Sequence, residues 1–145
     1  MSLETVKAWF DQAERDAEFA RYCHRGGYYT ESVVAAEQAF DKRLKALVLA
    51  AGGRIDSTHQ IHRLYALLVE WNVLADDERI RDDARQLFKE YQVSRYPMGE
   101  SPEAPYRLGS RQRAEWALDA VARLWSSSSP ALRELGVGHQ DESNR

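Results

Sequence analysis

The sequence predicts an all-α fold, an up-and-down antiparallel bundle of four or five helices. Five successive segments repeat apolar residues at helical spacing, and no segment has the pattern of a strand. The few glycines and prolines cluster between these segments. Short connections make consecutive helices antiparallel neighbours. The 145 residues fit one domain, whose core at this length needs neither a disulfide nor a metal.

The first two predicted helices each end at a pair of glycines. The first begins near Leu3 and ends at the pair 26–27, and the second begins near Thr30, a residue type that caps helix N-termini. The apolar stripe of the first helix contains Val6, Trp9, Phe10, Ala13, Ala17 and Ala20. The stripe of the second contains Val33, Ala36, Phe40, Leu44 and Leu47. We therefore expect Phe40 and Leu44 to lie in the core.

The remaining three helices follow the same pattern. The third begins near Ser57 or Thr58, the fourth near Asp76, whose charge suits a helix N-terminus, and the fifth after Gly109 and Ser110. The apolar stripe of the third helix contains Ile61, Leu64, Leu68 and Trp71. That of the fourth contains Ile80, Ala84, Leu87 and Tyr91, and that of the fifth contains Ala114, Leu118, Val121 and Trp125.

One connection is long, and the C-terminal end is rich in serine. Three prolines prevent the connection at about 92–109 from being helical throughout, and long loops in small domains are often functional. After Trp125, four serines and a proline predict a linker. We therefore expect the bundle to occupy residues 1–126. Residues 127–145 are expected to form a linker, a possible short helix at 131–135 and a disordered tail.

Charge and cysteine content narrow the class of protein. The net charge of -3 with 30% charged residues argues against a strongly cationic nucleic-acid binder, but allows a local basic pocket. Cys23 is the only cysteine, which excludes an internal disulfide and suits the reducing cytosol. Because neither a signal peptide nor an apolar run of membrane-spanning length is found, we expect a cytoplasmic protein without a membrane partner.

The second helix carries a polar face beside its apolar stripe. Gln38, Lys42 and Lys45 lie at positions i, i+4 and i+7, so that they share one side of the helix. This side is either a solvated face with a Gln–Lys pair or part of a basic binding site. Periodicity alone leaves both interpretations open.

Two histidines lie near the start of the third helix. Residues 58–62 are Thr-His-Gln-Ile-His, and at spacing i and i+3 His59 and His62 can face one site. Two ligands are too few for zinc, and no HExxH pattern is present. The sequence also lacks a glycine-rich phosphate loop. We therefore expect neither a metal nor a cofactor.

The fourth helix ends in Ser-Arg-Tyr-Pro. Because Pro97 disfavours the helical conformation at Tyr96, the chain turns there and presents Arg95 and Tyr96 at an end of the bundle. An arginine can bind a phosphate through two hydrogen bonds, and a tyrosine can stack on a base. Alternatively, Arg95 only interacts with the last carbonyls of its helix.

Taken together, these blocks resemble the HEPN domain family (higher eukaryotes and prokaryotes nucleotide-binding). The resemblance covers about residues 6–125. The first block of the resemblance is Ala-Glu-Arg-Asp at 13–16. The second is Gly-Tyr-Tyr at 27–29, which leads into Glu-Gln-Ala-Phe-Asp-Lys-Arg-Leu-Lys-Ala-Leu at 37–47. The last two are Thr-His-Gln-Ile at 58–61 and Ser-Arg-Tyr-Pro at 94–97. The blocks come in the family's order, and each alone is weak.

The resemblance implies a helical bundle that binds nucleotides or RNA. Prokaryotic members of this kind are often paired with a minimal nucleotidyltransferase in two-gene modules of toxin–antitoxin type, so that we expect such a partner. The nucleotide- or RNA-binding site would then contain Arg95, Tyr96, Lys42, Lys45, Gln38 and His59. The family is also commonly dimeric. A homodimer agrees with the surplus of large aromatics, with Trp9, Trp116 and Trp125 as candidate interface residues.

The alternative function is a metal-independent ribonuclease toxin. Many HEPN proteins use an arginine followed, after four to six residues, by a histidine. Arg95 has no histidine at that spacing, whereas Arg54 and His59 match it but lie between the second and third helices. Arg54 and His59 are therefore the weak catalytic candidates, and whether the protein is an enzyme stays open.

Overall fold

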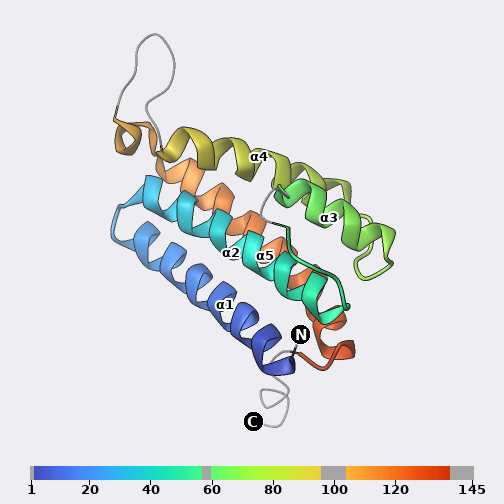
Figure 1. Cartoon of the computed structure of the whole chain (residues 1–145). Helices are drawn as coiled ribbons and strands as arrows, with labels where there is room; N and C mark the ends of the chain where they lie inside the picture. The colour runs from blue at the N-terminus through green and yellow to red at the C-terminus, as the bar shows by residue number, and fades with distance from the viewer. Residues whose placement is uncertain (1, 57–59, 96–103, 138–145) are drawn as a thin grey trace.

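The computed structural model describes residues 2–56, 60–95 and 104–137. Within these ranges the chain forms five α-helices, one 3-10 turn and no strand. The elements are α1 (Leu3–Arg25), α2 (Tyr29–Ala50), α3 (Ile61–Glu70), α4 (Glu78–Arg95), the turn η1 (Pro105–Leu108) and α5 (Arg111–Glu134). The predicted all-α bundle is confirmed (Figure 1). None of the helices in these ranges is long and apolar enough to cross a membrane.

Helix α2 is the central helix of the bundle. It packs against α1 on one side, against α3 and α4 on the other, and against α5 behind it (Figure 1). Because α2 has neighbours on several sides, most of its residues are buried, including charged ones. Phe40 and Leu44 are 0% exposed, which confirms the prediction that they belong to the core.

The helix termini follow from local side-chain hydrogen bonds. The Oγ of Ser2 accepts from the backbone N–H of Thr5 at 3.2 Å, and the Oγ of Ser110 accepts from that of Arg113 at 3.1 Å. At the start of α4, the carboxylate of Asp77 accepts from the N–H groups of Arg79 and Ile80 at 2.9 and 3.3 Å. The cap of α4 is therefore one residue later than the predicted Asp76.

The third helix differs from its prediction at both ends. Helix α3 begins at Ile61, and the predicted start at 57–58 lies outside the described residues. Trp71 was expected in the apolar stripe, but α3 ends before it and its side chain is 41% exposed. Its ring lies over Gly53, where an added Cβ would come within 2.6 Å of the ring. Trp71 therefore covers the end of α2 from outside the core.

The prediction of a linker after Trp125 is wrong, because α5 continues to Glu134. The hydroxyls of Ser128 and Ser129 donate back to the carbonyls of Leu124 and Trp125 at 2.6 and 2.7 Å, so these serines fit a helix. Beyond them, Ala131 and Leu132 are buried against the core. This apolar contact keeps the last turns helical in spite of Pro130 within them.

A buried arginine joins α1, α2 and α5. Arg43 is only 2% exposed. It donates to the hydroxyls of Ser128 and Ser129 at 2.8 and 3.1 Å and to the carboxylate of Glu14 at 3.2 Å, and its Cζ lies 4.4 Å from the ring centre of Trp125. Burial lowers the pKa of Arg43 to about 10, against the opposing effect of Glu14. Several hydrogen bonds and an ion pair therefore offset the free-energy cost of removing the charged guanidinium from water.

Candidate ligand-binding site at one end of the bundle

Five elements meet at the end of the bundle near the α1–α2 turn. These are the C-terminal ends of α1 and α4, the N-terminal ends of α2 and α5, and η1 (Figure 1). Thr30 fixes η1 on α2, because its hydroxyl lies 3.3 and 3.2 Å from the carbonyl oxygens of Pro105 and Tyr106. A Cβ on Gly109 would lie 2.2 Å from the hydroxyl of Thr30, so only glycine allows this close approach.

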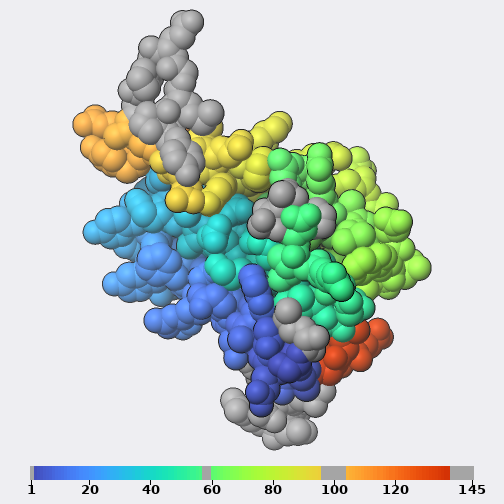
Figure 2. Space-filling model, in the orientation of Figure 1, coloured from blue at the N-terminus to red at the C-terminus, as the bar shows by residue number. Residues whose placement is uncertain are grey.

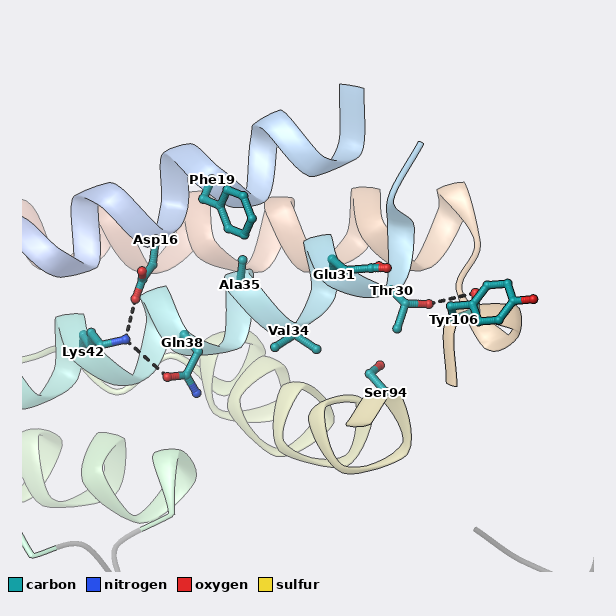
Figure 3. Close-up of a pocket in the computed structure, with 10 residues that line it drawn as sticks. All are labelled: Asp16, Phe19, Thr30, Glu31, Val34, Ala35, Gln38, Lys42, Ser94 and Tyr106. Atoms are coloured by element: carbon teal, nitrogen blue, oxygen red, sulfur yellow. Dashed lines mark hydrogen bonds and ion pairs between the residues drawn. The ribbon is translucent and has the colours of Figure 1, made fainter. Parts of the chain in front are cut away.

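A cavity of about 520 Å³ opens beside this junction, along α2. We call it the α2 cavity (Figure 3). Its lining residues are Asp16 and Phe19 from α1, Thr30, Glu31, Val34, Ala35, Gln38 and Lys42 from α2, Ser94 from α4 and Tyr106 from η1. The volume lies within the usual range of small-molecule sites, and apolar side chains form much of the wall.

The lysine in the α2 cavity is already engaged by the protein. Lys42 Nζ lies 2.5 Å from Asp16 Oδ2 and 3.2 Å from Gln38 Oε1 (Figure 3). The amide nitrogen of Gln38 in turn donates to Glu37 at 2.8 Å. Both polar ends of Gln38 and the charge of Lys42 therefore have partners within the chain.

Glu31 differs from these residues. Its Oε2 atom is buried and has no hydrogen-bond partner among the described residues. A buried carboxylate oxygen without a donor costs free energy, because it has lost water without gaining a replacement bond. Glu31 lines the α2 cavity, and its Oε2 atom is enclosed by the protein without a hydrogen-bond donor among the described residues.

Two carboxylates on either side of Gln38 in the sequence, the buried Glu37 and the half-buried Asp41, lie near a second lysine, Lys45. Glu37 is 5% exposed, and burial, followed by repulsion from Asp41, raises the pKa of its carboxyl to about 7. Burial also raises the pKa of Asp41, which accepts from Lys45 at 2.9 Å. Lys45 lies 5.8 Å from the ring centre of Trp9. The charge of Lys45 is thus matched by Asp41 and shielded by an aromatic ring.

Three arginines stack on tyrosines at the same end of the bundle. The Cζ atoms of Arg95, Arg107 and Arg111 lie 5.2, 5.4 and 6.0 Å from the ring centres of Tyr91, Tyr106 and Tyr29, respectively. We call these six residues the Arg–Tyr cluster. They come from α4, η1, α5 and α2, and Figure 2 shows the orange η1 region beside the yellow end of α4 and the light-blue first turns of α2. The three arginines and Tyr106 are exposed, whereas Tyr29 and Tyr91 are half-buried.

Exposed aromatic side chains, Tyr106 of the cluster among them, gather at this end of the bundle. Tyr22 and Tyr28, at the end of α1 and in the α1–α2 turn, are 64% and 62% exposed, and Phe19 and Tyr106 are similarly exposed. Exposed aromatics that gather in one place mark interaction surfaces, whereas single ones do not. This end is therefore the strongest candidate for a binding site in the part of the chain that the structure describes.

The structure brings some of the predicted site residues together. Gln38 and Lys42 line the α2 cavity, and Lys45 lies beside Asp41 outside its wall. Arg95 is the exposed last residue of α4, directly after Ser94 of the cavity, and donates to the hydroxyl of Tyr91. Tyr96 lies outside the described residues.

The structure describes only one of the two weak catalytic candidates. Arg54 is exposed in the connection between α2 and α3, and His59 lies outside the described residues. Within those residues, no group of three or more His, Cys, Asp or Glu side chains is placed to hold a metal ion. The expected interface residues Trp9, Trp116 and Trp125 pack partly buried against the chain's own core.

Several site residues were not predicted from the sequence. They are Phe19, Glu31, Glu37, Tyr106, Arg107 and Arg111. The segment Tyr-Arg-Leu-Gly-Ser-Arg at 106–111 carries the signal that could have found three of them, because arginines beside an aromatic residue are typical of nucleic-acid-binding surfaces. Glu37 has no such signal, since its burial depends on which helices surround α2.

Comparisons with known proteins agree on one family. The family model described as HEPN domain matches residues 6–129. A crystal structure of a protein from Thermus thermophilus is 30% identical, covering 88% of this chain and 98% of that one, with a TM-score of 0.77. The crystal structure of an archaeal HEPN homologue is 28% identical in sequence, and the match covers 90% of this chain and 97% of that one, with a TM-score of 0.69. The crystal structure of a HEPN domain protein from Thermotoga maritima shares the fold, with a TM-score of 0.62. It is 21% identical in sequence, and the match covers 95% of this chain and 98% of that one. Among curated proteins, the search found no match.

Proposed function

Because the chain belongs to the HEPN domain family, we propose that it is a binding module whose Arg–Tyr cluster holds a nucleotide or single-stranded RNA. The observation that carries this proposal is the stacking of three arginines on tyrosines from four elements at one end of the bundle. Arginine binds phosphate oxygens through two parallel hydrogen bonds, and exposed aromatic faces stack on unpaired bases.

Local charge supports this surface in a chain that is acidic overall. Arg107 and Arg111 are exposed and form no ion pair within 4.0 Å with a carboxylate among the described residues. Lys42 and Lys45, by contrast, are held by Asp16 and Asp41. The phosphates of the ligand would therefore contact the arginines, while the lysines keep their partners within the chain.

The experiment is a binding titration with labelled single-stranded RNA, followed by fluorescence anisotropy. Arg107→Ala and Arg111→Ala are each expected to weaken binding about tenfold, the effect of losing one hydrogen-bonded charge contact. Arg79→Ala, which removes an exposed arginine from the first turn of α4 at the other end of that helix, is the matched control. If three phosphates are contacted, a plot of the logarithm of the binding constant against the logarithm of the salt concentration should have a slope of about -2.

Two outcomes would refute the binding site. One is the absence of RNA and nucleotide binding by the wild-type protein at micromolar concentration. The other is an equal loss of affinity in Arg111→Ala and Arg79→Ala, because a general charge effect requires no Arg–Tyr cluster.

The partner proposed from the family resemblance is a minimal nucleotidyltransferase, in a module of toxin–antitoxin type. In this arrangement the HEPN chain binds nucleic acid or nucleotide and the partner supplies the transfer chemistry. Co-expression of the two proteins and purification through a tag on the nucleotidyltransferase tests the association. The ribonuclease alternative would use Arg54 and His59, and no described geometry favours it because His59 lies outside the described residues.

A further inference from the structure

The outer side of α1 carries large aromatic side chains. Helix α1 is an outer helix of the bundle, and it packs mainly against α2 and to a smaller extent against α5 (Figure 1). Ala13, Ala17 and Ala20 are buried on its inner side, whereas Phe19 and Tyr22 are 53% and 64% exposed. Exposed aromatic side chains that lie together mark interaction surfaces. The outer side of α1 is therefore a candidate for contact with another protein.

Four residues form a stripe along this side. Arg15, Glu18, Tyr22 and Arg25 follow one another at spacings of three, four and three residues, which is the spacing along which one helix packs on another. We call these four residues the outer stripe. Together with Phe19 they line a hollow of about 350 Å³ on the surface of α1. A side chain from a second helix can therefore enter between them.

The charges of the outer stripe are self-complementary. Glu18 lies one turn before Tyr22 and Arg25 one turn after it, so the ring has a negative group on one side and a positive group on the other. Glu18 has an exposed partner, Arg15 at 3.7 Å, and no carboxylate among the described residues pairs with Arg25. An exposed ion pair of this length contributes little to stability. Both charges therefore remain available to a second protein.

The direction of a helix that packs on the outer stripe follows from these charges. If two copies packed with their α1 helices parallel, Glu18 would face Glu18 and Arg25 would face Arg25, which is repulsive. In an antiparallel pair related by a two-fold axis, each contact between unlike residues forms twice. Two antiparallel registers join opposite charges of the stripe, Glu18 with Arg25 or Glu18 with Arg15.

The aromatic ring distinguishes these two registers. Pairing of Glu18 with Arg25 places the two-fold axis between residues 21 and 22, so that Tyr22 of one copy lies beside Tyr22 of the other. Pairing of Glu18 with Arg15 instead places Tyr22 level with Asp11 of the second copy. Aromatic pairs stabilise a contact, whereas a carboxylate against an aromatic face does not. The first register therefore satisfies the charges and the ring together.

We infer that the chain associates with a second copy of itself through the outer stripe, with Tyr22 at the two-fold axis and Glu18 of each copy paired with Arg25 of the other. None of the six residues of the Arg–Tyr cluster belongs to the outer stripe, so the inference goes beyond the proposed function and does not depend on it. It also gives the predicted homodimer an interface other than the tryptophans, which pack against the chain's own core.

Sedimentation velocity of the full chain over a range of micromolar concentrations tests the inference. Wild type should show an equilibrium of monomer and dimer without larger species, because an isologous contact closes on itself. Glu18→Arg and Arg25→Glu each set like charges against each other twice, and each should weaken dimerisation by about tenfold or more. Tyr22→Ala should weaken it by a similar factor, because it removes the aromatic contact at the axis.

Mixing the two charge variants makes the result specific. An equimolar mixture of the Glu18→Arg and Arg25→Glu proteins should form heterodimers, because each reversed charge then faces its opposite. The double variant should likewise regain the association of wild type. Lys7→Glu is the matched control, since it makes the same change of charge as Arg25→Glu at an exposed position of α1 before the stripe, and it should dimerise like wild type. Melting curves should agree among all variants, because the substituted positions are exposed.

Four outcomes would overturn the inference. They are a wild type that stays monomeric throughout the micromolar range, a dimer that survives both charge reversals, single variants that do not associate when mixed, and growth beyond the dimer. Dimerisation is distinguishable from RNA binding, because Arg111→Ala should dimerise normally. A wild type that dimerises through the outer stripe but binds no RNA would refute the proposed function and leave this inference standing.

Discussion

Ionisation of Glu37 should lower the stability of the bundle as the pH rises, and the substitution Glu37→Gln should remove this dependence. Glu37 is 5% exposed and its carboxyl accepts a hydrogen bond from Gln38, with Asp41 one turn further along α2. Burial, followed by repulsion from Asp41, raises its pKa from 4.5 to about 7. A carboxyl whose pKa is raised by folding holds its proton in the native state at a pH where the unfolded chain has released it. The stability that this group contributes is therefore complete below about pH 4.5 and is lost as the pH rises to about 7.

The size of the effect follows from the shift. A change of about 2.5 units corresponds to about 3 kcal/mol between low and high pH, since one unit is worth about 1.4 kcal/mol. Glu37→Gln keeps the shape and the hydrogen-bonding capacity but cannot ionise. Its stability relative to wild type should therefore increase by roughly 2–3 kcal/mol between pH 5 and pH 8. Burial, followed by repulsion from Arg63, lowers the pKa of His62, but His62 is present in both proteins and its effect cancels in the difference.

The assay is urea unfolding followed by circular dichroism at pH 5, 6, 7 and 8. Glu18→Gln, at an exposed position on α1, is the control and should differ from wild type by a constant amount. A constant difference between Glu37→Gln and wild type over this range would refute the reasoning. So would a difference of opposite sign, because it would mean that the native state stabilises the ionised carboxylate.

Four further results are expected. Phe40→Ala should lower the free energy of unfolding by roughly 3–5 kcal/mol in urea titrations, as for other large buried residues, and an unchanged midpoint would contradict the assigned helix phase. Arg43→Ala should cost a similar amount, roughly 3–5 kcal/mol, because it leaves Glu14 without its ion-pair partner and opens a cavity; a loss below about 1 kcal/mol would show that water replaces the guanidinium. Arg95→Lys should bind RNA with an affinity between those of wild type and Arg95→Ala at unchanged melting temperature, and a melting shift with unchanged affinity would make Arg95 structural. Light scattering at micromolar concentration should give the mass of a homodimer, and a monomer mass would contradict this prediction.

The fold was predictable because it depends on local information. The apolar repeat of α2 correctly placed Phe40 and Leu44 in the core, and the glycine pairs correctly marked the ends of α1 and α2. The serine-rich segment after Trp125 shows where local information fails. Serine favours turns in isolation, but here the hydroxyls of Ser128 and Ser129 bond within the helix and also accept from Arg43. Contacts from another helix therefore decided its conformation.

The candidate site was less predictable, since burial of charge depends on the neighbours of a helix. Glu37 and Arg43 belong to a segment with alternating charges that is typical of a solvated helix face. They are buried because α2 is packed on several sides, by α1, α3, α4 and α5. The alanines distributed around α2, at 35, 36, 39 and 46, carry a weak signal of this, because small residues on every side allow other helices to approach.

The cations of this protein differ in how readily they can serve a ligand. Lys42 and Lys45 are partly buried, and each holds a carboxylate at 2.5 and 2.9 Å, respectively. A phosphate that recruited either lysine would leave Asp16 or Asp41 half-buried without its partner, which opposes binding. Arg107 and Arg111 are exposed and stack on tyrosines, so a phosphate can approach their outer edges while the stacking remains. We therefore expect a phosphate to reach the arginines at the end of the bundle at a lower free-energy cost than the predicted lysine site on α2.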